Sequence, residues 1–356
     1  MAEIQELVAC ESPSDDPAAL DACAAIVARL VNEAGARVER RGTHVMGQWP
    51  GAGSRVLLLG HFDTVWPVGQ IRRQSIDIRD GQLFGPGVLD MKAGLAIAMT
   101  AMRVLASSSG AHRHPAVTLL ATSDEEVGSN SSRALIERLA RDSDAVLVFE
   151  PALPGGGLKT ARKGVGEFTV TATGVASHAG AQPHLGASAI NEIVRQVLDV
   201  QKHADPARGV TINVGLLEGG TRANVVAESA RAVVDVRVAR VEDASAIEQA
   251  LRGLTAHDPR VSVAVTGGIN RPPMERTREI AALFKTAQRF AAEMGVKLEE
   301  SATGGGSDGN FTAALGIPTL DGLGAVGEGA HALHESILVD RIADRIALLA
   351  QLVPAI

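Results

Sequence analysis

Three continuous apolar segments, each ending in a polar turn, constrain the fold of this chain more than any other feature. They are RVLLLG, AVTLLATS and DAVLVFE. Because apolar residues fill consecutive rather than alternate positions, we expect strands that are buried on both faces. A helical pattern begins at Pro17, with Ser14 or Asp16 as its cap, and MKAGLAIAMTAMRVL indicates another helix. Such strands and helices together predict an α/β fold with a mostly parallel sheet flanked by helices.

The middle of the chain follows a different pattern. Its segments alternate as β-α-β-β-α-β, in the order VGEFTVTATG, GASAINEIVRQVLDVQKH, GVTINVGLLEGG, ARAVVDVRVAR, EDASAIEQALRGL and RVSVAV. This order is typical of a ferredoxin-like α+β domain with half-exposed strands. We therefore predict that residues 164–270 are inserted between two parts of the α/β domain, residues 1–163 and 271–356.

The charge balance argues against two classes of partner. With a net charge of −7 over 356 residues and no basic block, we expect neither nucleic acid nor anionic membrane as a partner. No run of 18 apolar residues occurs and the N-terminus shows no signal-peptide pattern, so we expect a cytoplasmic protein. Cys10 and Cys23 fall in helical patterns and are expected to be small buried residues, with a disulfide as the alternative.

Side chains that can bind metal follow the predicted strands or stand in nearby turns. They are His61 after the first strand, Glu125 and Glu126 after the second, Glu150 ending the third, Asp90 in FGPGVLDMKAG, and His331 in GEGAHALHES. The carboxyl ends of parallel strands lie at one edge of a sheet, where ligands gather. Imidazole nitrogen suits zinc, and a carboxylate can bridge two cations about 3.5–4 Å apart. The set predicts a two-metal site that cuts an amide bond with metal-activated water.

Each of these residues also has an ordinary structural interpretation. A histidine two residues before an aspartate can hydrogen-bond within a turn, and adjacent glutamates can form a solvated acidic turn. Asp90 can cap the following helix, and Glu150 can be a strand-end carboxylate in water. All of these interpretations would have to hold together, whereas one shared site at the sheet edge explains every residue.

Spacing separates the roles within the predicted site. Consecutive side chains at a strand end point in different directions, so one of Glu125 and Glu126 should bind metal while the other holds water as a general base. Asp63 stands two residues after His61. We expect it to orient the imidazole rather than to bind metal.

The motifs together resemble a known enzyme family. GHFDTVWPVG, GPGVLDMKAG, DEEVGS, FEP, SHAG, GGGSDG and GAHALHE are similar, in the same order and over nearly the whole chain, to motifs of the co-catalytic dizinc metallopeptidases. That family includes bacterial glutamate carboxypeptidase, acetylornithine deacetylase, succinyl-diaminopimelate desuccinylase and aminoacylase. The resemblance implies a zinc-exopeptidase fold, a ferredoxin-like lid and dimerisation domain, and a cis peptide bond after Asp90. FDTVWPVG is most similar to the glutamate carboxypeptidase branch.

The resemblance also implies a role for each site residue. Asp90 would bridge two divalent ions, with zinc expected and cobalt or manganese as alternatives. The other ligands would be His61 and Glu150 at one ion and Glu126 and His331 at the other. Glu125 would be the general base. The family pattern places a glutamate four residues after the last histidine ligand, which favours His331 with Glu335 and leaves His334 as the alternative.

The expected substrate is a small molecule or short peptide with a free carboxylate. A glutamate at the position of Glu150 is found in family members that act on N-acylated amino acids or carboxyl ends. Arg237 is the candidate clamp for the carboxylate, and its alternative is a surface strand residue near Arg231 and Asp235. Further candidates are Asn224, the backbone N–H groups of Gly305, Gly306 and Ser307, and Arg271 as a second cation.

His178 in GVASHAGAQPHLG stands between a predicted strand and a predicted helix of the inserted domain. In related enzymes the matching histidine reaches the scissile carbonyl bound to the other subunit and donates to the oxyanion. The resemblance therefore implies a homodimer in which His178 is catalytic. The alternative is a loop histidine that caps the next helix.

Other functions compete with this interpretation. Gly305 to Gly309 matches a nucleophile-elbow pattern, and Asp321 followed by His331 or His334 has the chain order of a serine hydrolase that would use Ser307. That interpretation leaves the strand-end carboxylates without a role. A metal-dependent binding protein would need a damaged site, and no ligand position is substituted. Among hydrolases, the alternative to a carboxypeptidase is an N-acyl-amino-acid deacylase.

Overall fold

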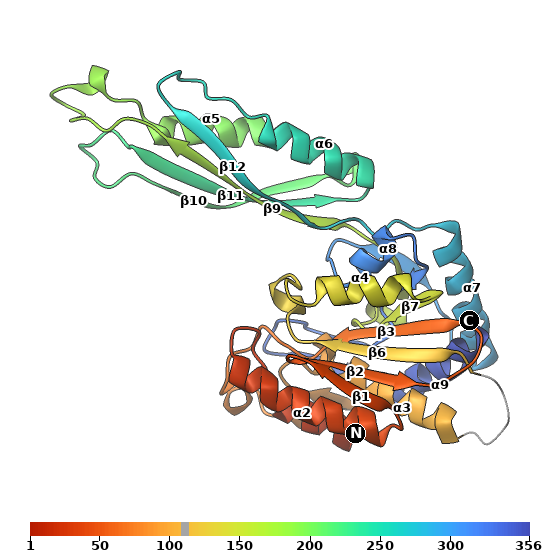
Figure 1. The fold of residues 1–356 in the computed structure, drawn as a ribbon. Helices are drawn as coiled ribbons and strands as arrows, with labels where there is room; N and C mark the ends of the chain where they lie inside the picture. The colour runs from red at the N-terminus through yellow and green to blue at the C-terminus, as the bar shows by residue number, and fades with distance from the viewer. Residues whose placement is uncertain (108–113) are drawn as a thin grey trace. The chain divides into compact units, whose positions relative to one another are not determined.

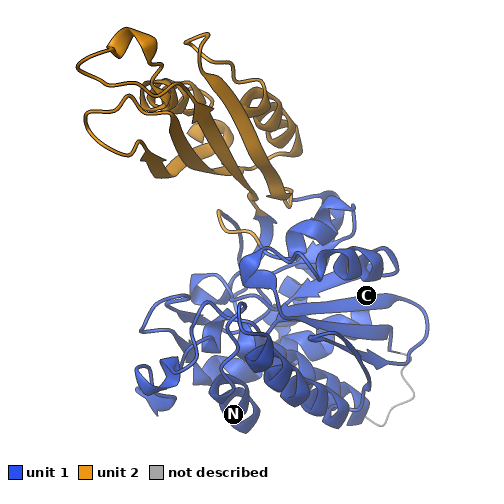
Figure 2. Ribbon diagram, turned by 60° about the vertical axis from the view of Figure 1, so that its left-hand side comes forward, with its two compact units in different colours: residues 1–161, 276–303, 307–356 blue, residues 162–275, 304–306 orange. Residues whose placement is uncertain are grey.

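The structure is a computed structural model that describes residues 1–107 and 114–356. This part of the chain divides into two compact units (Figure 2). Unit 1 comprises Met1–Ala161, Arg276–Thr303 and Ser307–Ile356, and unit 2 comprises Arg162–Glu275 and Gly304–Gly306. The first junction lies two residues before the predicted boundary and the second lies five residues after it. The sequence pattern did not predict that the short Gly304–Gly306 segment belongs to unit 2.

Unit 1 has helices on both faces of its main sheet (Figure 1). Its helices are α1 (Ala2–Ala9), α2 (Pro17–Glu33), α3 (Ala93–Ser107), α4 (Arg133–Arg141), α7 (Arg278–Glu293), α8 (Gly309–Ala314) and α9 (Ile342–Leu352). Its longer strands are β1 (Arg37–Arg41), β2 (His44–Trp49), β3 (Arg55–His61), β6 (Ala116–Thr122), β7 (Ala145–Val148) and β8 (Leu158–Arg162). Its shorter strands are β4 (Asp77–Arg79), β5 (Gln82–Phe84), β13 (Glu300–Thr303), β14 (Thr319–Leu320), β15 (Gly327–Glu328) and β16 (Ser336–Leu338).

The main sheet of unit 1 has the strand order β1-β2-β6-β3-β7-β14. Strand β3 pairs in parallel with β6 and β7, and β14 pairs in parallel with β7. The β1–β2 hairpin joins β6 in the antiparallel direction. The predicted mostly parallel sheet flanked by helices is therefore confirmed. Because β3, β6 and β7 run the same way, their carboxyl ends meet at one edge of the sheet.

Residues of β3 alternate between two hydrophobic layers. Val56 and Leu58 belong to the core formed with α1, α2, α3, α7 and α9, whereas Leu57 and Leu59 pack with α4 and α8. All four side chains are at most 1% exposed. Burial on both faces explains why the sequence of this strand is apolar at consecutive positions.

The first long helix begins where the sequence predicts. Pro17 is its first residue, and Asp16 Oδ1 accepts the backbone N–H groups of Ala18 and Ala19 at 3.0 and 3.1 Å. Asp16, rather than Ser14, is therefore the cap.

The two cysteines are free thiols, so the alternative of a disulfide is not realised. Cys23 is buried and Cys10 is partly buried. Among residues 1–107 and 114–356, no helix is long and apolar enough to cross a membrane.

Short strands build further sheets in unit 1 that the sequence pattern did not predict. One has the order β15-β16-β5-β4, and another pairs β13 with β8. Strands β5 and β16 have three residues each, too few to show periodicity. Their antiparallel pairing places the loop before Ser336 beside the loop after Phe84.

Unit 2 is a four-stranded antiparallel sheet packed against two helices. Its elements are β9 (Gly164–Thr173), α5 (Ala189–Gln201), β10 (Thr211–Gly219), β11 (Ser229–Val238), α6 (Val241–Arg252) and β12 (Ser262–Arg271). The sheet order is β10-β11-β9-β12, as in a ferredoxin-like domain. Alternate residues of β11, from Ala230 to Val238, are buried in the core shared with the helices, and the residues between them are not.

Candidate metal centre

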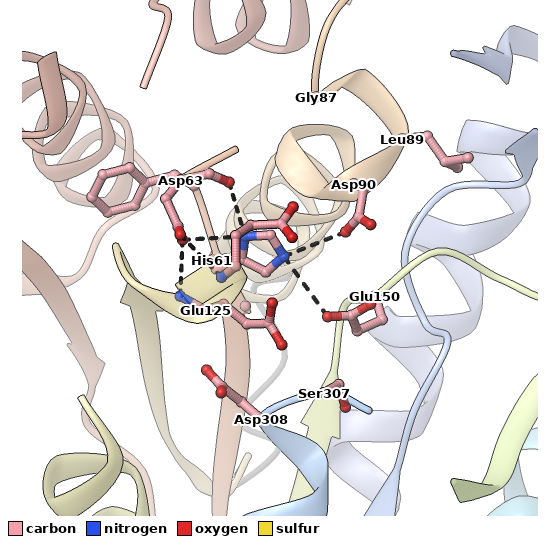
Figure 3. Close-up of polar contacts among 12 residues, drawn as sticks. His61, Asp63, Gly87, Leu89, Asp90, Glu125, Glu150, Ser307 and Asp308 are labelled. Carbon is pink, nitrogen blue, oxygen red and sulfur yellow. Dashed lines mark hydrogen bonds and ion pairs between the residues drawn. The ribbon is translucent and has the colours of Figure 1, made fainter. Parts of the chain in front are cut away.

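Four of the side chains that the sequence predicts at the site, His61, Asp90, Glu125 and Glu150, lie close together in Figure 3. His61 is the last residue of β3, and Glu150 stands two residues after the end of β7. Glu125 and Glu126 lie in the short helical turn Glu125–Val127 that follows β6. The parallel strand directions bring these side chains together, as the strand-end pattern indicates.

Asp90 lies between the two candidate histidine ligands. Its Oδ1 is 3.3 Å from His61 Nε2, and its Oδ2 is 3.4 Å from His331 Nε2. Glu150 Oε1 is 3.8 Å from His61 Nε2, and Glu126 Oε1 is 3.1 Å from His331 Nε2. A shared carboxylate with one histidine and one glutamate on each side is a donor set suited to two bridged cations. The histidine that contacts Asp90 and Glu126 in this cluster is His331.

The backbone at two of these positions is unusual. Asp90 stands in the helical turn Val88–Lys92 before α3, and its peptide bond to Met91 is cis, as the family resemblance implies. His331 has a φ of 62°, in the left-handed region that residues other than glycine seldom adopt. A left-handed φ at a residue other than glycine costs on the order of 1–3 kcal/mol. It is retained where the surrounding structure enforces it, often at functional sites.

The donor set fits metal ions. His61 is buried, and among the described residues its Nε2 has no hydrogen-bond partner. The nitrogen faces the carboxylates of Asp90 and Glu150 at 3.3 and 3.8 Å without a well-formed hydrogen bond, and a cation coordinated there would satisfy all three groups. The ligating atoms of His61, Asp90 and Glu126 lie within 4.8 Å of one another, as do those of His61, Glu125 and Glu150. Two overlapping groups of donors, which share His61, are therefore available.

The carboxylates hold protons on both imidazoles. Burial lowers the pKa of His61, but the carboxylates of Asp63 and Asp90 raise that pKa well above its usual value. Hydrogen bonds to Asp90 and then Glu126 raise the pKa of His331 to about 10. Burial raises the pKa of Asp90, but the two imidazoles outweigh burial and lower it. A divalent cation must therefore displace protons when it binds.

Asp63 organises the turn that carries the two glutamates. His61 Nδ1 donates to the backbone carbonyl of Asp63 at 3.0 Å, and the Asp63 carboxylate is 3.4 Å from that nitrogen. This donation leaves Nε2 as the nitrogen that can bind metal. The carboxylate also accepts the backbone N–H groups of Glu125 and Glu126 at 3.2 and 3.1 Å and the hydroxyl of Ser14 at 2.7 Å. The spacing of the sequence did not indicate this second task.

Glu335 holds the loop that carries Asp90. Its buried carboxylate accepts four N–H groups, from the backbone of Gly87, Leu89 and Asp90 at 2.9, 2.9 and 3.1 Å and from the Trp66 indole at 3.0 Å. Because Glu335 stands four residues after His331, it connects the two loops that supply these ligands. The only signal in the sequence was that spacing.

The serine hydrolase triad is not assembled. Ser307 is fully buried, and its hydroxyl donates to Asp321 Oδ2 at 2.7 Å, whereas His331 lies in the carboxylate cluster. The expectation that the backbone N–H of Ser307 is open to a substrate is wrong. It donates to Asn310 Oδ1 at 2.9 Å and so closes the turn that begins α8.

The two arginines that are candidates for binding the substrate carboxylate lie in unit 2. Arg237 on β11 forms a bidentate ion pair with Asp235 on the same strand, from Nε to Oδ1 at 2.9 Å and from Nη2 to Oδ2 at 2.8 Å. This ion pair is what the alternative interpretation of Arg237, a surface strand residue near Asp235, describes. Arg271 on β12 is buried. Arg237 and Arg271 pair with Val165 of β9 from opposite sides, so their Cα atoms are two strand spacings, roughly 10 Å, apart.

Gly305 and Gly306 lie beside this row of residues. Their carbonyl oxygens each accept from Arg162 Nη1 at 3.1 Å. A Cβ atom on Gly306 would lie 2.8 Å from Val165 Cγ2 and 2.9 Å from Arg271 Cδ. The close approach requires glycine and sets the loop backbone against Arg271.

His178 and Asn224 lie together in another part of unit 2. The N–H of the residue after His178 donates to the Asn224 carbonyl at 3.0 Å. His178 is exposed, and its Nδ1 accepts the N–H groups of Gly180 and Ala181 at 3.2 and 3.0 Å. His178 therefore caps its own turn, whereas helix α5 is capped by Ser188. Since Nδ1 accepts, the neutral ring carries its proton on Nε2.

Comparisons with known proteins agree with this geometry. The sequence profile of peptidase family M20/M25/M40 matches residues 57–355. The chain is 32% identical over 320 residues to carboxypeptidase G2 of Pseudomonas sp. strain RS-16, covering 88% of this chain and 76% of that protein. It is 29% identical over 372 residues to succinyl-diaminopimelate desuccinylase of Cereibacter sphaeroides, covering 95% and 93%. The crystal structure of aminopeptidase PepT from Bacillus cereus has a TM-score of 0.81 at 23% identity, covering 99% and 96%, and supports the fold.

Proposed function

The chain belongs to peptidase family M20/M25/M40, and from this premise we propose that it is a glutamate carboxypeptidase-like hydrolase. The reaction is hydrolysis of an amide bond whose leaving group is an amino acid with a free α-carboxylate, glutamate in the first instance. The observation that carries the proposal is the position of Asp90 between His61 and His331, with a further glutamate beside each imidazole.

Two divalent ions, zinc in the first instance and cobalt or manganese otherwise, would supply Lewis-acid polarisation of the carbonyl and an activated water. Asp90 would be shared by the two ions, His61 and Glu150 would hold one, and Glu126 and His331 would hold the other. Asp63 orients the His61 ring through its backbone carbonyl and carboxylate. Glu335 fixes the loop of the bridging ligand.

Glu125 is the proposed general base. Its backbone N–H is held by Asp63 at 3.2 Å, and its carboxylate lies within 4.8 Å of the ligating atoms of His61 and Glu150. From this position Glu125 takes a proton from the attacking water and delivers it to the nitrogen of the leaving amine. One carboxylate thus serves as base and then as acid, and no second proton donor is needed for the leaving group.

The α-carboxylate of the substrate is assigned to the cationic row of unit 2. Arg237 would bind it bidentately in place of Asp235, and Arg271 with the backbone of Gly305 and Gly306 would complete the recognition. Exchange of one carboxylate for another on the Arg237 fork needs no new cation, which supports the clamp role. The Nε2–H of His178, with Asn224 beside it, is assigned to the oxyanion of a substrate bound to a partner subunit.

An N-acyl-amino-acid deacylase is the second candidate function. The similarity to a succinyl-diaminopimelate desuccinylase, which covers 95% of the chain, favours it. Both candidates use the same metals and the same base. They differ in the group on the acyl side of the scissile bond.

The test is a substrate screen on enzyme stripped of metal by a chelator and reloaded with zinc, cobalt or manganese. We expect activity only in reloaded samples, and hydrolysis of N-acyl and peptidyl amino acids with a free α-carboxylate but not of their α-amides. In Arg237→Ala the preference for the free acid over the amide should shrink. Activity that survives chelation, or equal cleavage of free acids and amides by the wild-type enzyme, would refute the proposal.

A further inference from the structure

A cavity in unit 1 borders the proposed metal centre. Its volume is about 260 Å³, and Glu126 forms part of its lining. The same glutamate places Oε1 3.1 Å from His331 Nε2. A group in this cavity would therefore be next to one of the proposed metal ligands.

Apolar side chains form two walls of the cavity. Val65 and Val127 line it. The two residues are 45% and 53% exposed, whereas most valines of unit 1 are buried in its core. Val65 stands two residues after Asp63, and Val127 ends the turn of Glu125 and Glu126. Covering such side chains with an apolar group is favourable by roughly 25 cal/mol per Å² in general. The two segments that carry ligands and base thus also supply an apolar surface for substrate.

The charge of the cavity is negative. Among the described residues that line it, Asp15 and Glu126 are the charged ones and none is cationic. Asp15 is exposed. Glu126 is a proposed metal ligand, so in the metal-loaded enzyme Asp15 is the lining charge that a group in this cavity would meet. A carboxylate beside Asp15 would be repelled by like charge, whereas an uncharged group would not.

We propose that this cavity binds the acyl side of the substrate and selects an uncharged, apolar acyl group over a dicarboxylic one such as succinyl. The inference rests on the proposed function, because the free α-carboxylate of the leaving amino acid needs a cation. That half of the substrate does not suit this cavity, so the acyl half is assigned to it. At about 30 Å³ for each water-sized group, the volume admits roughly nine non-hydrogen atoms, the size of a benzoyl group.

The test compares matched substrates on the metal-loaded enzyme. N-succinyl-L-glutamate and N-succinamoyl-L-glutamate differ only by the charge of the terminal group. We expect kcat/KM to be at least tenfold higher for the succinamoyl compound, and higher again for N-benzoyl-L-glutamate. Asp15→Asn should bring the succinamoyl-to-succinyl ratio close to one. Asp142→Asn, which removes an exposed charge at the end of α4, serves as the control and should leave the ratio as in the wild type.

The apolar wall is tested separately. Val127→Ser and Val65→Ser should each lower the advantage of the benzoyl over the succinamoyl substrate. A wild-type enzyme that prefers the succinyl compound, or a charge preference that Asp15→Asn does not move, overturns the inference while the proposed function stands. If none of the three glutamate derivatives is hydrolysed by reloaded enzyme, the proposed function itself fails.

Discussion

At the scale of single residues, the site uses carboxylates whose surroundings separate their tasks. Asp90 turns one oxygen to each imidazole, whereas Asp63 and Glu335 accept backbone N–H groups. A carboxylate surrounded by N–H donors is already satisfied and fixes the loops around it. One that faces imidazole nitrogens provides the donors that a cation needs. All three side chains are carboxylates, so the difference in their tasks comes from the groups that surround them.

Replacing the proposed base should separate metal binding from turnover. In Glu125→Gln the five proposed ligands survive while the proton acceptor is gone, so we expect two metal ions per chain and a fall in kcat of about 10²–10⁴. Metal analysis of the purified variant and steady-state kinetics measure both quantities. Glu137→Gln on α4 is the matched control and should behave as the wild type. Loss of one ion in Glu125→Gln would show that Glu125 is a ligand instead.

The affinity for metal should depend on pH through His331. Asp90 and Glu126 raise the pKa of this imidazole to about 10 in the metal-free protein, so it is protonated at neutral pH. Since a bound cation requires the neutral ring, affinity should strengthen as the pH rises from 6.5 towards 10, with release of protons on binding. The same protonation stabilises the metal-free protein below pH 6.5, and this contribution is lost as the pH rises through about 10. Calorimetric titrations in buffers of different ionisation enthalpy would detect the protons, and a pH-independent affinity would contradict the assignment.

At the scale of elements, burial decides what the sequence can predict. Strands β3, β6 and β7 are covered on both faces, so their residues form continuous apolar runs that are visible in the sequence. Because these strands are parallel, their ends share one edge, and the pattern alone places His61, Glu125, Glu126 and Glu150 together. The βαββαβ order of unit 2 is likewise visible, since alternating burial along β9 and β11 leaves a period of two.

Features that depend on contacts between distant segments could not be predicted. Strands β5 and β16 have three residues each, yet their pairing brings Glu335 beside the loop of Asp90. The pairing of Arg237 with Asp235 was only one of two open interpretations, because both an ion pair and a substrate clamp suit an arginine on an exposed face. The amide of Ser307 was expected to be open, but the fold uses it to close a turn with Asn310.

The close contact of helix α3 with the end of β7, beside the loops that carry Asp90 and Glu150, depends on a glycine at position 94. Helix α3 begins three residues after Asp90, and a Cβ atom on Gly94 would lie 2.2 Å from the backbone oxygen of Phe149, which precedes Glu150. Gly94→Ala should therefore move the helix from the end of β7 and lower the free energy of unfolding by about 1–3 kcal/mol. Denaturant unfolding measures the change. Gly304→Ala, where an added methyl group meets nothing within 4 Å, is the control. Equal stability of the two variants would show that α3 adjusts freely.

At the scale of the whole molecule, the length of strand β9 decides whether Arg237 and His178 of one chain can contact the same substrate. Arg237 pairs with Val165 near the start of β9, whereas His178 stands beyond the end of that strand at Thr173. Eight residues of extended chain span roughly 26 Å. A small amino-acid derivative cannot bridge that length, so the clamp and the oxyanion histidine of one chain cannot hold the same substrate. The proposed roles of both residues therefore require a second copy of the chain.

Unit 2 carries a surface suited to that second copy. Ile190, Val194 and Leu198 recur every four residues along α5 and are 39%, 46% and 61% exposed. Strand β10, an edge of the sheet, adds Leu216 and Leu217, which are 57% and 54% exposed. An apolar helix face beside an unpaired strand edge is a surface that soluble proteins usually cover. We infer that α5 and β10 form the interface of the proposed homodimer.

Complementation between two inactive variants tests the shared site. His178→Ala lacks the oxyanion donor and Glu125→Gln lacks the base, so each should be inactive alone. In a hybrid dimer, the base of one chain and the histidine of the other restore one of the two sites. Random exchange at equal concentrations makes half of the dimers hybrids, so we expect recovery of about one quarter of the wild-type activity. The same mixture with Leu198→Glu added to both variants should stay monomeric and inactive. If labelled subunits exchange and no activity returns, His178 does not act on the substrate of its partner, and the trans arrangement is wrong.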